Sequence, residues 1–332
     1  MKSPLRYLPW EYLGLFCVLL ALIGLFGLLS DHFLTLLTFT TIANQIPALA
    51  VIAIGMTFVL LIAGIDLSVG SLLALSGALI GWVLVDWQQS ILVAACVGVM
   101  AGAVCGLING FISAHWAIPS FIVTLGMLEI GRGAAYLTTG SQTHYLGASV
   151  SAIATPLPGL GLSPSLVLAV LLVVIGQVVL SKTVFGRYLI AVGTNEEAVR
   201  LSGIKTTPIK IAAFVISGLM AGLGGLFHVA YLESADPNAG IGLELSAIAA
   251  VVIGGTSLAG GRGSVVNSFL GVLIIAVLQT GLAQVGASEP TKRVITGVVI
   301  VVAVILDVYR HRAGDFKAYA VRVFRLNRPA SD

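Results

Sequence analysis

A series of long apolar segments limits the fold of this chain more than any other feature. Most run to roughly 18 to 25 residues, the length that a helix rising about 1.5 Å per residue needs to cross a hydrocarbon core of about 30 Å. The composition agrees, because 58% of the 332 residues are apolar and only 9% are charged. The alternating strands of a membrane barrel are absent from the pattern. We therefore expect an all-α, polytopic membrane protein.

Ten segments qualify as candidate transmembrane helices. They cover residues 11–29, 47–63, 69–86, 90–113, 119–138, 164–182, 208–232, 241–256, 264–286 and 290–309. The eighth is the weakest of them, because it is short and ends in glycines. Residues 33–46 are too polar and too few for another crossing, so we expect a re-entrant or interfacial segment there.

The positive charges predict the orientation of these helices. With ten crossings and the N-terminus inside, all but three of the 17 Lys and Arg residues fall on the cytoplasmic side, as the positive-inside rule requires. The exceptions are Arg132, Lys292 and Arg293. Both termini are then cytoplasmic, with a transmembrane domain over residues 1–310 and a basic tail over 311–332.

Two glycine-rich and serine-rich breaks interrupt the apolar pattern. The first, GIDLSVGS at 64–71, places Asp66 between two apolar runs, and a carboxylate at membrane depth is costly. We expect Asp66 or Ser68 to cap the following helix at the cytoplasmic end, where water shares the stabilisation. The second, GGTSLAGGRGS at 254–264, suits a tight cytoplasmic turn. Gly261 stands where a phosphate-binding Walker loop requires Lys, which argues against nucleotide binding by this chain.

Several other polar side chains lie within the apolar segments. Glu129 and Arg132 share one helix face at a spacing of three, either as a structural ion pair or as groups that touch a polar solute. Isolated polar groups of this kind either join helices or contact a solute. Our candidates for a solute pathway or gate are Asn44, Asp66, Ser68, Asn109, Phe121 and Thr124. Glycines repeat at Gly98, Gly102 and Gly106 and predict close helix packing.

The longest internal hydrophilic segment, residues 181–210, contains a helix signature. Thr194 and Glu197 have the spacing of a capping box, and Gly203 suits the position after the helix end. The stretch TNEEAVRLSG thus predicts a short helix on a cytoplasmic loop, shaped to dock on another protein, although an ordinary ordered loop would share the pattern. The scattered histidines and the missing serine-nucleophile motif give no metal site and no catalysis.

Three stretches together carry a family resemblance. GIDLSVGS at 64–71, GRYLIAVGTNEEAVRLSGI at 186–204 and ELSAIAAVVIGGTSLAGGRGS at 244–264 resemble the membrane permease subunits of ABC sugar importers, in the branch of the ribose, xylose and galactose systems. The resemblance covers about residues 35–310, and PSFIVTLGML at 119–128 is similar too. It implies a non-catalytic bacterial inner-membrane subunit for a monosaccharide, with ribose favoured.

The resemblance also implies partners. These are a second permease subunit, cytoplasmic ATPase subunits that hold ATP and Mg, and a periplasmic sugar-binding protein, with no cofactor in this chain and no nucleic acid. Residues 182–210 would form the loop that couples to the ATPase, although Val199 departs from the E-A-A-x-x-x-G pattern of other importers. The implied coupling residues are Asn195, Glu196, Glu197, Ala198, Arg200, Leu201 and Gly203.

One alternative from another class stays open. In an ion-coupled secondary transporter of a small polar solute, Asp66 and Glu129 would be the coupling carboxylates. The role of Asp66 is also open, because it either holds the helix break in shape or lines an inner gate.

Overall fold

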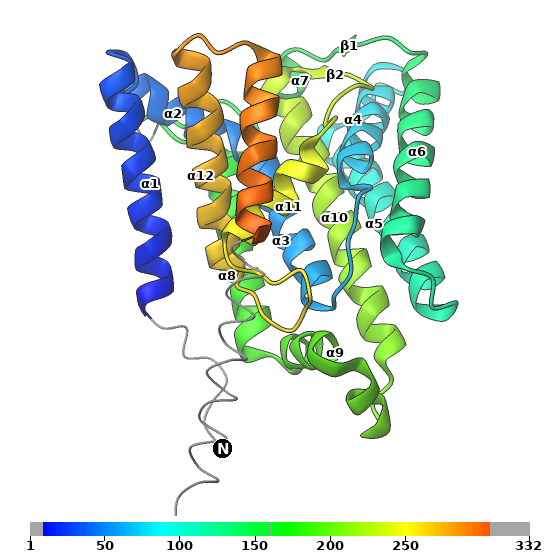
Figure 1. Cartoon of the computed structure of the whole chain (residues 1–332). Coiled ribbons are helices and arrows are strands. Elements are labelled where there is room, and N and C mark those ends of the chain that lie inside the picture. Colours follow the sequence, from blue (N-terminus) through cyan, green and yellow to red (C-terminus); the bar gives the residue numbers. More distant parts are fainter. Residues whose placement is uncertain (1–8, 160, 306–332) are drawn as a thin grey trace, which may run out of the picture.

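The computed structural model describes residues 9–159 and 161–305 (Figure 1). Helices make up about three quarters of it: α1 (Pro9–Leu29), α2 (Leu36–Gln45), α3 (Pro47–Leu61), α4 (Val69–Val85), α5 (Ile91–His115), α6 (Ser120–Thr139), α7 (Ala148–Ser151), α8 (Pro164–Lys182), α9 (Val184–Leu201), α10 (Thr206–Leu232), α11 (Leu243–Ile253), α12 (Val265–Gln284) and a last helix over residues 289–305. The short strands β1 (His144–Tyr145) and β2 (Ser234–Ala235) pair antiparallel. The predicted helical architecture is confirmed, and the tail predicted over 311–332 lies outside the described residues.

Five of the described helices are long and apolar enough to cross a membrane, namely α1, α5, α8, α10 and α12. A sixth span is counted if α2 and α3, which are bent by 45° relative to each other, cross together. Residues 33–46, predicted to be re-entrant or interfacial, thus contain a helix of 10 residues joined to α3 by a bend. The full topology of ten crossings and the cytoplasmic placement of both termini stay predictions.

The helices beside the two sequence breaks are short. α4 has 17 residues and α11 has 11, so α11 reaches only about 16 Å. It fills only part of the predicted crossing 241–256, because the backbone turns at Gly242 with a φ of 83° and ends the helix at Gly254. In Figure 1, both short helices have one end in the middle of the bundle. Both breaks therefore interrupt helices inside the bundle.

Figure 1 also shows how the bundle is closed at its two ends. α9 lies across one end, and the β1–β2 ribbon with α7 lies at the other. The segment between α3 and α4 runs from the α9 end toward the middle of the bundle, and the segment after α11 returns to the α9 end. The α9 end is therefore where both breaks and the predicted docking segment meet.

Small residues allow a close helix contact between α5 and α10. A Cβ added at Gly102 would collide with the carbonyl oxygen of Gly218, and one at Gly106 would collide with the carbonyl oxygen of Phe214. Helices in lipid gain most of their association from such close packing. The packing role predicted for the glycine repeat is therefore confirmed.

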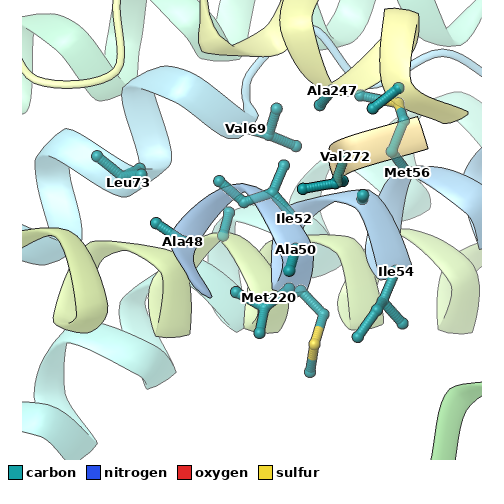
Figure 2. Close-up of a cluster of buried hydrophobic side chains, with 14 of the residues drawn as sticks. Ala48, Ala50, Ile52, Ile54, Met56, Val69, Leu73, Met220, Ala247 and Val272 are labelled. Carbon is teal, nitrogen blue, oxygen red and sulfur yellow. The ribbon is translucent and has the colours of Figure 1, made fainter. Parts of the chain in front are cut away.

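Buried apolar side chains surround α3 at the centre of the bundle. Figure 2 shows this core, in which side chains from five helices meet: Ala48, Ile52 and Met56 of α3, Val69 and Leu73 of α4, Met220 of α10, Ala247 of α11 and Val272 of α12. Because α3 is covered by its neighbours along almost its whole length, it behaves as the fixed centre of the subunit rather than as a surface helix.

Candidate functional site

The predicted docking helix is a separate segment at the end of α9. The backbone leaves helical geometry at Asn195, with a φ of −162° and a ψ of 94°. The Asn195 side-chain oxygen then accepts a hydrogen bond of 2.9 Å from the amide of Ala198, which is the geometry of a helix N-cap. After the segment, Gly203 has a φ of 81°, as a residue just past a helix end requires. We call residues 195–203 the docking segment.

The cap predicted at Thr194 is wrong by one residue. Thr194 still belongs to the first part of α9, where its hydroxyl donates to the carbonyl of Ile190 at 2.7 Å. A threonine that bonds back to the preceding turn cannot at the same time cap the next helix. Asn195, the next residue, caps the docking segment instead.

The docking segment turns most of its side chains outward. All seven predicted coupling residues are exposed, and Leu201 is 79% exposed although it is apolar. Arg200 donates to both carboxylate oxygens of Glu197, at 2.9 and 2.7 Å. Val199, the residue that departs from the family pattern, is buried. The segment therefore exposes one ion pair and one large apolar side chain, that of Leu201, on the surface of the bundle.

Glu196 holds the docking segment to the rest of the subunit. Its carboxylate accepts hydrogen bonds from Thr206 at 2.9 Å and from Lys210 at 3.1 Å, both at the start of α10. The pair with Lys210 is also an ion pair. A force on the docking segment is thus transmitted to α10 as well as to α9.

The first break, residues 62–68, is closed around a buried carboxylate. One oxygen of Asp66 accepts bonds from the Ser68 amide at 3.0 Å and the Ser68 hydroxyl at 2.6 Å, and the other accepts from Ser217 of α10 at 2.8 Å. Asn109 of α5 donates to the Ser68 hydroxyl at 3.0 Å. All four side chains are 0% exposed. The carboxylate therefore joins the break to α10, and the Ser68 hydroxyl extends the network to α5.

Two expectations about Asp66 are corrected. Asp66 bonds the amide of Ser68, the residue before α4, and no side chain caps the free amides of α4. Nor does water share the stabilisation, because the carboxylate is fully covered by the chain. Burial is tolerated since hydroxyl and amide donors replace the lost water.

α6 satisfies the backbone of the first break. The Ser120 hydroxyl accepts from the amide of Ile65 at 2.9 Å, and Thr124 bonds both the amide of Leu67 and the carbonyl of Ile65. A non-helical segment inside a membrane bundle needs such partners, because lipid offers none. Thr124 is thus placed where its side chain maintains the break.

The second break, residues 254–264, contains Arg262 and is bordered by several neutral polar side chains. Thr57 of α3 donates to the hydroxyl of Ser268 at 2.8 Å, and Thr256 lies 3.4 Å from the same hydroxyl. Gln177 of α8 accepts from the amides of Val265 and Val266, at 2.9 and 3.3 Å. The predicted turn is present, but it is packed into the bundle and capped from a neighbouring helix.

α9 touches the end of α3 and the second break at one glycine. A Cβ added at Gly193 would collide with the carbonyl oxygen of Leu61, at the end of α3, and would lie 2.5 Å from the amide nitrogen of Gly261. That amide donates to the same Leu61 carbonyl at 2.9 Å. We call this contact of Leu61, Gly193 and Gly261 the glycine junction. It lies two residues before the N-cap of the docking segment.

The ion pair predicted between Glu129 and Arg132 is not formed. The Arg132 guanidinium donates instead to the carbonyls of Pro237 and Ala239, at 2.6 and 2.7 Å. Within residues 9–159 and 161–305, the ion pairs join Arg200 to Glu197, Lys210 to Glu196 and Lys292 to Glu289. The loop before α11 offers Arg132 two fixed acceptors, which outcompete a flexible carboxylate on the same helix.

The proposed pathway residues do not form one open channel. Asp66, Ser68, Asn109 and Thr124 lie together at the first break, and all are buried. Asn44 accepts from the Ser163 amide at 2.9 Å, far along the chain near the β1–β2 end. Phe121 is 48% exposed on α6. A pathway role for these residues stays a prediction.

A cavity of about 410 Å³ lies near the β1–β2 end of the bundle. It is lined mainly by small and hydroxyl side chains of α2, α10 and the segment after α7: Leu37, Thr40, Thr41, Asn44, Ser151, Ala154, Thr155, Pro156, Gly161, Ala230, Tyr231 and Glu233. It adjoins none of the groups at the breaks.

Three functional positions were missed from the sequence. Ser217 holds Asp66, Gln177 caps α12, and Gly193 forms the junction. Gln177 could have been found, because it interrupts the apolar run VVIGQVVL. Ser217 and Gly193 gave no such signal in a chain with 39 glycines and many small polar residues.

A bundle of apolar helices with two internal breaks is typical of membrane transport proteins. Residues 38–304 match the family described as the permease component of branched-chain amino acid transport systems. The match covers most of the chain, so the protein belongs to this family of permeases.

The most informative relatives are named as sugar permeases. The ribose import permease protein RbsC of Escherichia coli K12 is 40% identical over 294 residues, covering 87% of this chain and 91% of that protein. RbsC of Bacillus subtilis is 41% identical over 306 residues, with coverages of 90% and 92%. The fructose import permease protein FrcC of Rhizobium meliloti is 34% identical over 302 residues, with coverages of 88% and 84%. No solved structure matched the chain.

Proposed function

We propose that this chain is the membrane permease subunit of an ATP-driven importer for a monosaccharide, with a ribose-type pentose as the favoured solute. The single observation that carries the proposal is the identity of about two fifths with ribose import permeases over most of both chains. Other relatives are named for fructose, L-arabinose and D-allose. All of these solutes are neutral sugars, so the solute class is better supported than the particular sugar.

The chain binds no nucleotide in this proposal. Cytoplasmic ATPase subunits hold ATP and Mg, a periplasmic binding protein delivers the sugar, and two copies of the permease form the pathway in the bacterial inner membrane. The exposed docking segment supports an ATPase partner, because Leu201 and the Glu197–Arg200 pair offer apolar contact and charge on a rigid helix.

The geometry supports a route for the motion. When the ATPase subunits close on ATP, they displace the docking segment. The displacement reaches α10 through Glu196 and reaches the second break through the glycine junction. Since backbones at the junction are in direct contact, a small shift of α9 cannot be absorbed by side-chain rotation. The second break and α11 therefore move with the docking segment.

An ion-coupled transporter remains the alternative to be excluded. Asp66, one of the two carboxylates that such a mechanism would use, is fully enclosed by serine and amide donors. That enclosure favours a structural role over one in which the carboxylate exchanges ions with water.

Uptake measured in proteoliposomes decides between the two. Purified permease, ATPase and binding protein are reconstituted together, and radiolabelled ribose is added with ATP inside or outside the vesicles. We expect uptake that requires ATP hydrolysis and the binding protein and that persists when a protonophore collapses the proton gradient. Uptake driven by an ion gradient in the absence of the ATPase would contradict the proposal.

A further inference from the structure

Halfway along α6, Glu129 is exposed on the outside of this subunit. Its carboxylate accepts no hydrogen bond and forms no ion pair within the described part of the chain. Arg132, its predicted partner, instead donates hydrogen bonds to carbonyls of the loop before α11. The Glu129 carboxylate is therefore unpaired within the described residues. It lies in the middle of a helix whose other exposed residues are mostly apolar.

Lipid is a poor environment for this side of α6. Carboxylates in membrane bundles face the protein interior or water, because hydrocarbon cannot solvate them. Residues 119–138 are a predicted crossing, and halfway along it a Glu side chain is too short to reach the headgroups from either end. The Glu129 carboxylate therefore needs water, a polar solute or a second protein surface beside it.

Further polar groups lie beside Glu129 along α6 and the start of α11. Arg132 lies within electrostatic range of Glu129, Asp236 and Glu244. Glu244, in the first turn of α11, is partly exposed and accepts from the Gly242 amide at 3.2 Å. The charged residues of this region thus gather on one side of the bundle, between α6 and α11.

Two glycines on α6 leave room around Glu129. Gly126 and Gly133 stand three residues before and four residues after it, so all three lie on one side of the helix. A Cβ added at either glycine would meet no atom within 4 Å. This contrasts with Gly131 on the opposite side of α6, which is packed closely against Ser71 of α4. Glu129 is therefore unobstructed along the helix in both directions.

We infer that the surface formed by Gly126, Glu129, Arg132, Gly133 and Glu244 lines the aqueous pathway of the solute, and that Glu129 accepts hydrogen bonds from sugar hydroxyl groups. We call it the α6–α11 surface. An ionised carboxylate has two acceptor oxygens, which suit the neighbouring hydroxyl groups of a sugar. The solute class in this inference rests on the proposed function, whereas access of water to Glu129 does not.

Thiol labelling tests access of water directly. Cys17, Cys96 and Cys105 are first replaced by serine or alanine, and Glu129→Cys and Leu20→Cys are made separately in the assembled transporter in membrane vesicles. Leu20 is a matched control, since it is half exposed on the apolar helix α1. A membrane-impermeant maleimide should modify Glu129→Cys at least about tenfold faster than Leu20→Cys, because only a thiol in contact with water ionises and reacts.

Two results would overturn the inference. Equal, slow labelling of both cysteines would place Glu129 against lipid. A Glu129→Cys variant that resists the maleimide but forms a disulfide-linked dimer on mild oxidation would place α6 in a packed contact between two copies.

Transport kinetics test the contact with the sugar. Glu129→Gln should raise the KM for sugar by about tenfold with little change in kcat, the loss expected for one hydrogen bond to a charged group. Asp31→Asn is the control, because it removes an exposed carboxylate away from this surface, and it should leave KM unchanged. An unchanged KM in Glu129→Gln would reject the contact. If the unsubstituted complex imports no sugar, the proposed function fails, and the labelling result still decides whether the surface is aqueous.

Discussion

The two breaks of this bundle interrupt helices in similar ways but are stabilised by different chemistry. The first, residues 62–68, is held by a fully buried carboxylate whose donors come from α10 and from the break itself. The second, residues 254–264, has neutral hydroxyls of Thr57 and Ser268 beside it and contains Gly260 and Gly261, with φ values of 84° and 75°. Charge-assisted bonds are stronger than neutral ones, and the Asp66 carboxylate provides three of them in the first break.

The two breaks also differ in their contacts with α9. Gly261 of the second break lies against Thr194 and Gly193 of α9, directly before the docking segment. The first break is instead bonded to α5, α6 and α10. We propose that the first break fixes α4 in place, whereas the second break responds to the docking segment. Four substitutions can test this division.

Replacing Asp66 should have the largest effect on stability. Asp66→Leu leaves the Ser68 amide and two hydroxyls without an acceptor, and we expect a loss of about 3–5 kcal/mol, enough to prevent recovery of folded protein. Asp66→Asn keeps acceptor oxygen and should cost roughly 1–2 kcal/mol. Thermal unfolding in detergent measures both. Equal losses would show that the charge, rather than the hydrogen bonds, holds the first break.

Gly193→Val should come next, and its main effect should be on transport. The added side chain collides with the backbone of Leu61, so α9 must move away from the junction. We expect uptake to fall by more than about tenfold, with a stability loss of roughly 1–3 kcal/mol from overpacking. Gly24→Val on α1 is the control, because no atom lies within 4 Å of its added Cβ. Normal uptake by Gly193→Val would remove the junction from the coupling route.

Gln177→Leu should have an intermediate effect at the second break. The substitution preserves volume but removes the acceptor for the Val265 and Val266 amides, so we expect a loss of about 1–2 kcal/mol. Hydrogen exchange should rise at the start of α12 and stay unchanged at the start of α4. Equal hydrogen-exchange protection of α12 in Gln177→Leu and in the unsubstituted protein would mean that Ser264 alone is a sufficient cap.

Glu197→Lys should change stability least. The Glu197–Arg200 pair is exposed, with side chains 59% and 68% accessible, and exposed pairs contribute at most about 1 kcal/mol. Uptake should nevertheless be lost, because the charge offered to the ATPase is reversed. Unchanged uptake would count against docking through this segment.

The sequence predicted those features that are local. The carboxylate in GIDLSVGS, the glycine repeat on α5 and the helix in TNEEAVRLSG follow from the cost of charge in lipid and from helix-end preferences, and all are present. The cap was misplaced because Thr194 and Asn195 are neighbours that both cap well. Only the preceding turn decides between them.

The features that depend on distant contacts could not be predicted. Arg132 bonds carbonyls 105 and 107 residues away, so its spacing from Glu129 suggested the wrong partner. The burial of Asp66 depends on Ser217, which is 151 residues away. The topology of ten crossings stays a prediction, because α11 is shorter than a full span and the last helix is described only to residue 305.

The difference between the breaks can be measured directly during turnover. In a cysteine-free background, Ala259→Cys reports on the second break and Leu67→Cys on the first, in the full transporter with its ATPase. We predict that addition of ATP changes the labelling rate of Ala259→Cys by at least about fivefold and leaves that of Leu67→Cys within about twofold. The same change at both positions, or a change at Leu67→Cys alone, would contradict the account.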